Sequence, residues 1–443
     1  MSTTVDNDYE LRDTFSTNNV KKDITNIYSD SNNSLTQTIK GEEGFSRTGS
    51  SFGAYFNVVC VVAGTGTLGI PYALKQGGWI AVLFLALSAC MSFYTGRLLM
   101  ECLYCKEGER LHSYPEIGEA SFGKWGKFIV QIFHYTTLLG VSCLYVMLVG
   151  INVYQLAVTY NYTELPLEVW TAIGGAVIII PYISLKTLKE VAWLSSFGAL
   201  ATFVVVVVSV VAGLLDLKNQ TLNETQVVNW PEIPVSLATI AFSFGGNVVY
   251  PHIEASMKKP KNWTKVLGFS MTTIFLFYAL IGIVGYYVYG IHVQSPIMKS
   301  LPAELPNTIA TATITLHVIL VIPITLCAFS LEVEKRFNID REHYSKINEF
   351  LIRSVIRLVA LISLSLIAIY VPDFPFFMSL LGALSNCAVV FIIPIICHVK
   401  LFGFKGRPYW EYLWMLLVLI VALVGCILGA YLAIVDIINK YTK

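Results

Sequence analysis

The chain has 443 residues, of which 55% are hydrophobic and only 13% are charged, and its mean hydropathy is +0.64. A water-soluble domain carries about 25% charged residues, so a soluble multidomain protein of this length is excluded. The formal net charge of +1 gives no overall field that would favour nucleic acid or an acidic substrate as a partner.

Residues 1–50 form a polar tail that is rich in Ser, Thr, Asn and Asp. The tail contains no apolar segment of the kind that a secretory signal requires. We therefore predict that residues 1–50 form a disordered tail. Phosphorylation of the tail is an alternative role, and a solvated tail is the simpler interpretation.

Eleven apolar segments follow the tail, each long enough to cross a hydrocarbon core of about 30 Å. Their predicted limits are 54–75, 79–101, 127–158, 167–184, 191–215, 233–257, 265–290, 304–331, 353–371, 374–398 and 410–437. Outside the tail, twenty lysines and arginines lie in or beside connectors on the tail's side of the membrane, and five lie on the opposite side. Because cytosolic connectors accumulate positive charge, we predict a cytosolic amino terminus.

Asn-X-Thr triplets give a partly independent check of this topology. Asn161, Asn219 and Asn223 lie in connectors predicted to face the lumen or the exterior, so they are candidate glycosylation sites. A fourth triplet at Asn262 lies in a lysine-rich connector and is expected to stay unmodified. Such triplets often arise by chance, so they support the topology without proving it.

The first and sixth segments contain residues that interrupt membrane helices. The first carries AGTGTLG from Ala63 and then Pro71, and the sixth carries FSFGGN from Phe242 and then Pro251. Glycine weakens a helix and proline removes a backbone donor. Although single glycines usually serve close packing, these motifs open two successive groups of five segments. Such paired interruptions predict that residues 51–443 form a transmembrane transporter domain with an inverted repeat, and that the eleventh segment lies outside the repeat.

An interrupted helix exposes backbone groups that can bind a small zwitterion. A helix starting near Leu68 would present N–H groups to a carboxylate, and helix ends near Ala63 and Ser243 would present carbonyl groups to an ammonium group. Burying a zwitterion without such partners would be prohibitive. The predicted substrate-binding residues are Ala63, Gly64, Thr65, Gly66, Thr67, Phe242, Ser243, Phe244, Gly245 and Gly246.

Three ionisable residues at predicted membrane depth are candidates to carry a coupling proton. His134 and His317 lie midway along the third and eighth segments, and Glu254 lies in the inner half of the sixth. For either histidine alone, a neutral ring hydrogen-bonded to a neighbouring helix is the simpler interpretation. For Glu254, an ion pair with a Lys or Arg on the cytosolic side is an equal alternative. Sodium coupling stays open, since hydroxyl and carbonyl oxygens also bind Na⁺.

No residue pattern predicts a metal, a cofactor or an enzyme. Seven of the nine cysteines lie inside apolar segments, and Cys102 and Cys105 form a CxxC pair without two further ligands at a zinc-site spacing. The sequence has no nucleophile–histidine–acid spacing, HExxH motif or phosphate-binding loop. A channel is disfavoured, because no filter motif or repeated ring of charge is present.

Four stretches of the sequence resemble the amino acid/auxin permease family of transporters. They are NVVCVVAGTGTLGIPYALKQGGW from Asn57, SYPEIGEASFG from Ser113, IAFSFGGNVVYPHIEASMKKP from Ile240 and IAIYVPDF from Ile367. The resemblance extends over essentially all of the chain after the tail. Within that family the similarity is greatest to fungal vacuolar amino acid transporters and to the vesicular inhibitory amino acid transporter.

The resemblance implies a leucine-transporter-like fold, which is all-helical with two inverted repeats of five helices plus one extra helix. It also implies that amino acids are moved by secondary active transport, in symport or exchange with protons. The implied location is the membrane of a vacuole or another acidic organelle, with the plasma membrane as the alternative. The alternative function is an amino acid sensor that has the same binding site but little or no transport.

Overall fold

The computed structural model describes residues 47–106, 109–162, 165–184, 194–218, 223–339, 343–404 and 407–442. Residues 1–46 of the predicted tail lie outside these ranges. In chain order, the helices of the described residues are α2 (Ser51–Val62), α3 (Gly66–Gly77), α4 (Ala81–Leu103), α5 (Tyr114–Thr159), α6 (Leu167–Ser184), α7 (Leu194–Asp216), α8 (Ile233–Ser243), α9 (Tyr250–Ser256), α10 (Trp263–Tyr289), α11 (Leu305–Arg336), α12 (Lys346–Tyr370), α13 (Phe374–Leu381), the π-helix η6 (Gly382–Ile392), α14 (Ile393–Phe402) and α15 (Tyr409–Thr442).

Within the described ranges, nine helical segments are long and apolar enough to cross a membrane. The α2–α3 pair is a further candidate, bent by 50° at its break. Neither α8 nor α9 is long enough alone, but together they extend over residues 233–256 with a gap at Phe244–Val249. With α8 and α9 taken as one interrupted segment, the total reaches the eleven that hydropathy predicts.

Two predicted segment limits are wrong, and a third segment is not a continuous α-helix. α5 begins at Tyr114 rather than at residue 127, and it bends at Phe122 and Gly123, where the φ of Gly123 is 66°. α12 begins at Lys346 rather than at residue 353. The tenth segment contains the π-helical stretch η6 between α13 and α14. Hydropathy misses the first two features because a helix continues into polar residues, and it misses the third because π and α turns can have the same composition.

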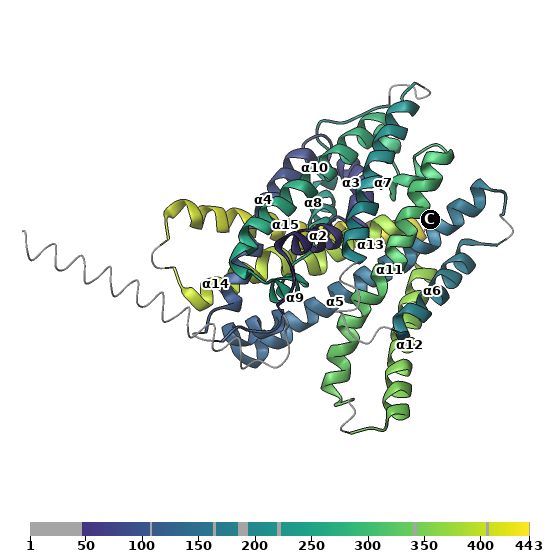
Figure 1. Cartoon of the computed structure of the whole chain (residues 1–443). Helices are drawn as coiled ribbons and strands as arrows, with labels where there is room; N and C mark the ends of the chain where they lie inside the picture. Colours follow the sequence, from purple (N-terminus) through teal and green to yellow (C-terminus); the bar gives the residue numbers. More distant parts are fainter. Residues whose placement is uncertain are drawn as a thin grey trace, which may run out of the picture.

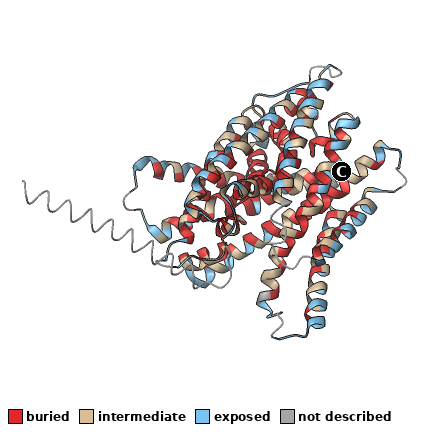
Figure 2. Ribbon diagram, viewed as in Figure 1, coloured by how far each residue is buried: buried red, intermediate tan, exposed pale blue. Residues whose placement is uncertain are grey.

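The helices differ in how much of their surface faces protein. In their most apolar 18-residue windows, α5 is 72% buried whereas α6 is 28% and α12 is 17% buried. Figure 2 shows the buried residues gathered in the middle of the molecule and along α5 and α11, with exposed faces on α6 and α12. The exposed side of α12 includes Val355, Val359 and Ile362, which is the composition expected of a lipid-facing surface.

Close packing in the middle of the molecule positions the two interrupted segments. α3 packs against α8 and α10, and α8 packs in turn against η6 and α15. The labels of α3, α8, α10 and α15 lie in the middle of the molecule in Figure 1. A β-carbon on Gly382 of η6 would lie 1.9 Å from the carbonyl oxygen of Ala238, so only glycine permits this approach of η6 to α8. The interruptions therefore lie in the densest part of the fold.

Candidate substrate-binding site

The first interruption lies between Val62, where α2 ends, and Gly66, where α3 begins. The hydroxyl of Thr67 donates to the carbonyl oxygen of Ala63 at 2.5 Å, which ties the start of α3 to the end of α2. Thr65 precedes α3 without capping it by a side-chain hydrogen bond. The positive end of the α3 dipole is thus left without a side-chain cap, which suits an anionic group.

The second interruption runs from Phe244 to Val249 and is held by two asparagines. The side-chain amide of Asn386, on η6, donates to the carbonyl oxygen of Phe242 at 3.1 Å. Asn247 donates to the carbonyl oxygen of Val390 at 3.1 Å, while its own Oδ1 is buried with no hydrogen-bond partner. Two hydrogen bonds thus join this region to η6: one reaches the carboxyl end of α8, and the other comes from an asparagine side chain of the interruption itself.

The two interruptions meet each other. A β-carbon on Gly66 would lie 2.8 Å from the α-carbon of Ser243, so the start of α3 touches the end of α8. The hydroxyl of Tyr278, on α10, lies 2.7 Å from the carbonyl oxygen of Val62 and 2.6 Å from that of Ser243. One buried hydroxyl therefore lies within hydrogen-bond distance of carbonyl groups at the carboxyl ends of both α2 and α8.

The remaining predicted binding residues lie around this junction. The hydroxyl of Tyr145 is 3.1 Å from the position of a β-carbon on Gly64. The ring of Phe244 packs edge-on against Tyr278, with the ring centroids 5.3 Å apart. A β-carbon on Gly245 would lie 2.3 Å from the amide nitrogen of Asn386, and one on Gly246 would lie 2.6 Å from a methyl carbon of Val62.

The polar side chains of the junction are sealed from solvent and uncharged. Thr65, Thr67 and Ser243 are each at most 2% exposed, and Phe242 is 6% exposed. The carbonyl groups at the helix ends already accept hydrogen bonds from Tyr278 and Asn386. An ammonium group can enter this arrangement by sharing or replacing those donors, and a carboxylate can accept from the start of α3.

Tyr278 and Asn386 were missed by sequence reasoning. Asn386 did carry a signal, because it is a lone amide in the apolar run from Phe374 to Cys397. Tyr278 gave no signal of its own, since α10 also contains Tyr286, Tyr287 and Tyr289 and aromatic residues in membrane helices usually serve packing or interfacial anchoring.

The three proton-coupling candidates occupy three different environments. His317, on α11, is 1% exposed, and its Nδ1 is 2.7 Å from the position of a β-carbon on Gly198 of α7. The same position on Gly198 is 2.4 Å from the sulfur of Cys60 on α2, so His317 lies where α2, α7 and α11 converge. His134 Nε2 lies 3.7 Å from Glu332 Oε1, and His134 Nδ1 is buried without a partner.

Glu254 forms an ion pair with an arginine, which was the predicted alternative to a proton-carrying role. Its carboxylate, 1% exposed, accepts from Arg110 at 2.8 Å and from the Tyr104 hydroxyl at 2.5 Å. Arg110 also donates to the carbonyl oxygen of Pro251 at 2.6 Å. The backbone N–H of Gly49 donates to the carbonyl oxygen of Ser256, the last residue of α9. These contacts tie α9 to the connector before α5 and to the residues that precede α2.

A second group of buried charges was also missed. Arg357, only 2% exposed, donates to Glu334 at 3.1 Å and to the carbonyl oxygen of Tyr182 at 2.9 Å. Arg353 donates to the other carboxylate oxygen of Glu334 at 3.0 Å. Both arginines were counted as connector charges, but they lie in the first half of α12 because the helix starts at Lys346. This group joins α6, α11 and α12.

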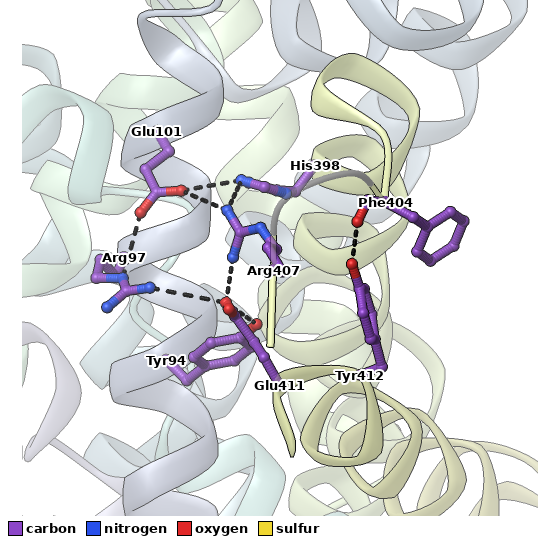
Figure 3. A network of polar contacts seen from close by, with 8 residues as sticks. All are labelled: Tyr94, Arg97, Glu101, His398, Phe404, Arg407, Glu411 and Tyr412. Carbon is purple, nitrogen blue, oxygen red and sulfur yellow. Dashed lines mark hydrogen bonds and ion pairs between the residues drawn. The ribbon is translucent and has the colours of Figure 1, made fainter. Parts of the chain in front are cut away.

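A third group of charges joins α4, α14 and α15 (Figure 3). Glu101, at the end of α4, is 2.9 Å from His398 Nε2 and 3.3 Å from Arg407. Arg407 also pairs with Glu411 at the start of α15, which accepts from the Tyr94 hydroxyl at 3.0 Å. These contacts link the ends of three helices that are far apart in the sequence.

The glycosylation candidates differ in accessibility. Asn161 is exposed, in the turn after α5. The side-chain amide of Asn223 donates to the carbonyl oxygen of Val288 at 2.7 Å, so attachment of a glycan there would remove a hydrogen bond. Asn219 lies outside the described residues. Over the described ranges, no group of three or more His, Cys, Asp or Glu side chains is placed to hold a metal ion.

The chain matches known proteins over nearly all of its described length. The profile of the family described as "Transmembrane amino acid transporter protein" matches residues 47–438. Amino acid transporter AVT1C of Arabidopsis thaliana is 29% identical over 402 residues, which are 89% of this chain and 71% of that protein. Amino acid transporter AVT1I of the same plant is 28% identical and covers 88% of this chain and 96% of its own length.

Solved structures share the fold at low sequence identity. MhsT in complex with L-phenylalanine aligns with a TM-score of 0.53 and 10% identity, over 88% of this chain and 100% of that one. Mhp1, a nucleobase-cation-symport-1 family transporter, aligns with a TM-score of 0.53 and 12% identity, over 87% and 91% of the two chains. The predicted leucine-transporter-like fold is confirmed. The chain belongs to the transmembrane amino acid transporter protein family, whose members are transporters and not enzymes.

Proposed function

We propose that this protein moves amino acids by secondary active transport, coupled to protons, across the membrane of a vacuole or another acidic organelle. The observation that carries the proposal is the meeting of two interrupted helices at Tyr278. Family membership supports the substrate class. The resemblance to vacuolar transporters supports the location, and the distribution of lysine and arginine supports a cytosolic amino terminus.

The substrate binds, in this proposal, between the start of α3 and the ends of α2 and α8. Its carboxylate lies against the start of α3, which has no side-chain cap and whose dipole favours negative charge. Its ammonium group donates hydrogen bonds to the carbonyl oxygens of Val62 and Ser243, to which the Tyr278 hydroxyl donates in this structure. Phe242 and Phe244 border the same junction and cover the substrate side chain.

Transport requires the sealed junction to open to each side in turn. We propose that the Arg110–Glu254 pair helps to close one side, because it joins α9 to the connector before α5. We propose His317 as the main proton carrier, since it lies where α2, α7 and α11 converge and its helix packs against α5 and α7. His134 beside Glu332 is the second candidate.

Uptake of a labelled amino acid into proteoliposomes, with and without an imposed pH gradient, tests the function. Each pH unit supplies about 1.4 kcal/mol per proton, enough for roughly a tenfold gradient of amino acid. We expect uptake that rises with the gradient and collapses when a protonophore is added. Binding without uptake would favour the alternative, an amino acid sensor, and uptake that follows a sodium gradient would contradict proton coupling.

The binding site is tested by Tyr278→Phe, with Tyr287→Phe as the matched control on the same helix. Tyr287 is 49% exposed, so the control removes a hydroxyl away from the junction. We expect Tyr278→Phe to change the concentration of amino acid that half-saturates uptake, whereas Tyr287→Phe leaves it unchanged. Equal behaviour of the two variants would contradict a role for the junction in binding.

His317→Gln tests the proposed proton carrier, with His292→Gln as the control at an exposed position. Glutamine can hydrogen-bond but does not titrate in this pH range. We expect His317→Gln to retain exchange of labelled for unlabelled amino acid but to lose the response to the pH gradient. A full response in His317→Gln would exclude this residue as the carrier and leave His134 as the candidate.

A further inference from the structure

A groove of about 560 Å³ lies between α14, the first half of α15 and the bend near the start of α5. It is distant in sequence from both interrupted helices. Its walls are apolar, with Ile395, Met415 and Leu419 among the lining residues. Of the ten residues that line it, Lys400 alone carries a charge.

Aromatic residues next to those that line the groove indicate that one end of the groove lies near a membrane–water interface. Exposed aromatic residues flank it on both sides: Trp125 and Phe128, 77% and 54% exposed, follow the bend in α5, and Tyr409 and Trp410, 88% and 67% exposed, begin α15. Such aromatic side chains mark the level of the lipid headgroups. Lys400 is exposed, with its ammonium group 6.0 Å from the ring centroid of Phe122.

The size of the groove favours a lipid over a protein helix as its occupant. Eight residues of a helix about 10 Å wide fill a cylinder of roughly 900 Å³, which exceeds the volume available. An acyl chain is thinner, and burial of its methylene groups against apolar walls stabilises the complex. A cation at the rim of an apolar groove is complementary to an acyl chain that carries an anionic headgroup.

We propose that this groove binds an anionic phospholipid, with an acyl chain against α14 and α15 and its phosphate headgroup at Lys400. The carboxyl end of α14, where Lys400 lies, is on the lysine-rich side of the membrane that is predicted to face the cytosol. Anionic lipids are concentrated in cytosolic leaflets. This site is separate from the amino acid site, so it does not depend on the proposed transport function.

The bound lipid would brace the connector between α14 and α15. Phe404 and Tyr412 line the groove, and the Tyr412 hydroxyl donates to the carbonyl oxygen of Phe404. Figure 3 shows this pair beside Arg407 and Glu411, which connect the same segment to α4. Filling the groove therefore supports one wall of the charged group that joins the three helices.

The test uses the full chain purified in an uncharged detergent. Phosphatidylglycerol and phosphatidylcholine with the same acyl chains are added separately, and bound lipid is counted by native mass spectrometry. We expect tighter binding of phosphatidylglycerol, together with a higher midpoint of thermal unfolding. Lys400→Gln removes about 1 kcal/mol of attraction to the headgroup, so the affinity for phosphatidylglycerol should fall about fivefold.

Ile396→Trp fills the groove and should reduce binding of both lipids. Lys265→Gln and Leu276→Trp are the controls, because they make the same changes at exposed positions on α10, outside the groove. Size-exclusion chromatography verifies that each variant is folded. Equal binding of the two lipids by the wild-type protein, or an unchanged preference for phosphatidylglycerol in Lys400→Gln, would overturn the proposal.

Discussion

Two regions of this molecule bury polar groups by different means. At the junction of the interrupted helices, carbonyl groups of Val62, Phe242 and Ser243 accept hydrogen bonds from the uncharged side chains of Tyr278 and Asn386. The second region consists of the helix ends on the predicted cytosolic side. There, carboxylates pair with arginines, as Glu334 does with Arg357. The junction and the Glu334–Arg357 pair are both almost fully buried, but only the pair carries formal charge.

The difference fits two mechanical requirements. A neutral hydrogen bond contributes about 0.5–1.5 kcal/mol, so a substrate can replace it without a large loss of stability. Separating one partner of a buried ion pair costs about 3–5 kcal/mol, so such pairs hold helices together unless both charges are solvated at once. The junction is therefore suited to exchange partners with a ligand, and the ion pairs are suited to fix helix positions.

The largest effect should come from Glu334→Leu. The substitution leaves Arg357, 2% exposed, without its carboxylate partner, so the free energy of unfolding should fall by about 3–5 kcal/mol. Thermal unfolding in detergent measures the change, and Glu304→Leu at an exposed position is the control. The double variant Glu334→Leu/Arg357→Met should recover much of the loss. A single variant as stable as the control would show that the ion pair does not hold these helices.

A smaller loss of stability is expected for Tyr278→Phe. The carbonyl oxygens of Val62 and Ser243 lose their shared donor while they stay buried, which costs about 1–3 kcal/mol. The thermal midpoint should fall by less than in Glu334→Leu, and Tyr287→Phe should be unchanged. A loss larger than that of Glu334→Leu would contradict the contrast between the two regions.

Ser243→Ala tests the junction with a weaker interaction. The Ser243 hydroxyl donates to the carbonyl oxygen of Thr239 at 3.0 Å, within its own helix. The loss should be about 0.5–1.5 kcal/mol. Ser363→Ala removes the equivalent bond to Val359 on the exposed face of α12 and should cost less. If the two substitutions have equal effects on the thermal midpoint, burial at the junction adds nothing to this bond.

The smallest effect is expected for Lys440→Gln. Lys440 pairs with Asp373; the lysine side chain is 64% exposed and the carboxylate 10%, and an ion pair whose cation lies in solvent contributes about 0–1 kcal/mol. Asp373 also accepts from the backbone N–H of Phe376 and keeps that bond in the variant. The thermal midpoint should stay within error of the wild type at low and high salt. A shift comparable to that of Glu334→Leu would show that exposure does not distinguish these ion pairs.

Local patterns in the sequence determined a large part of this protein. Apolar segment length predicts the membrane class and the number of crossings, and the motifs from Ala63 and Phe242 predict where α2 and α8 end. These features follow from residues that are neighbours in the chain, because hydropathy and the effects of glycine and proline on a helix act over a few residues.

Contacts between distant segments were decided only by the tertiary structure. Tyr278 is 216 residues from Val62, and Asn386 is 144 residues from Phe242. Glu254 pairs with Arg110 across 144 residues. No local periodicity encodes which tyrosine, amide or arginine meets a given helix end, because that choice depends on the packing of the whole helix bundle. The sequence thus specified where helix backbone would be freed, and the fold specified which side chains would satisfy it.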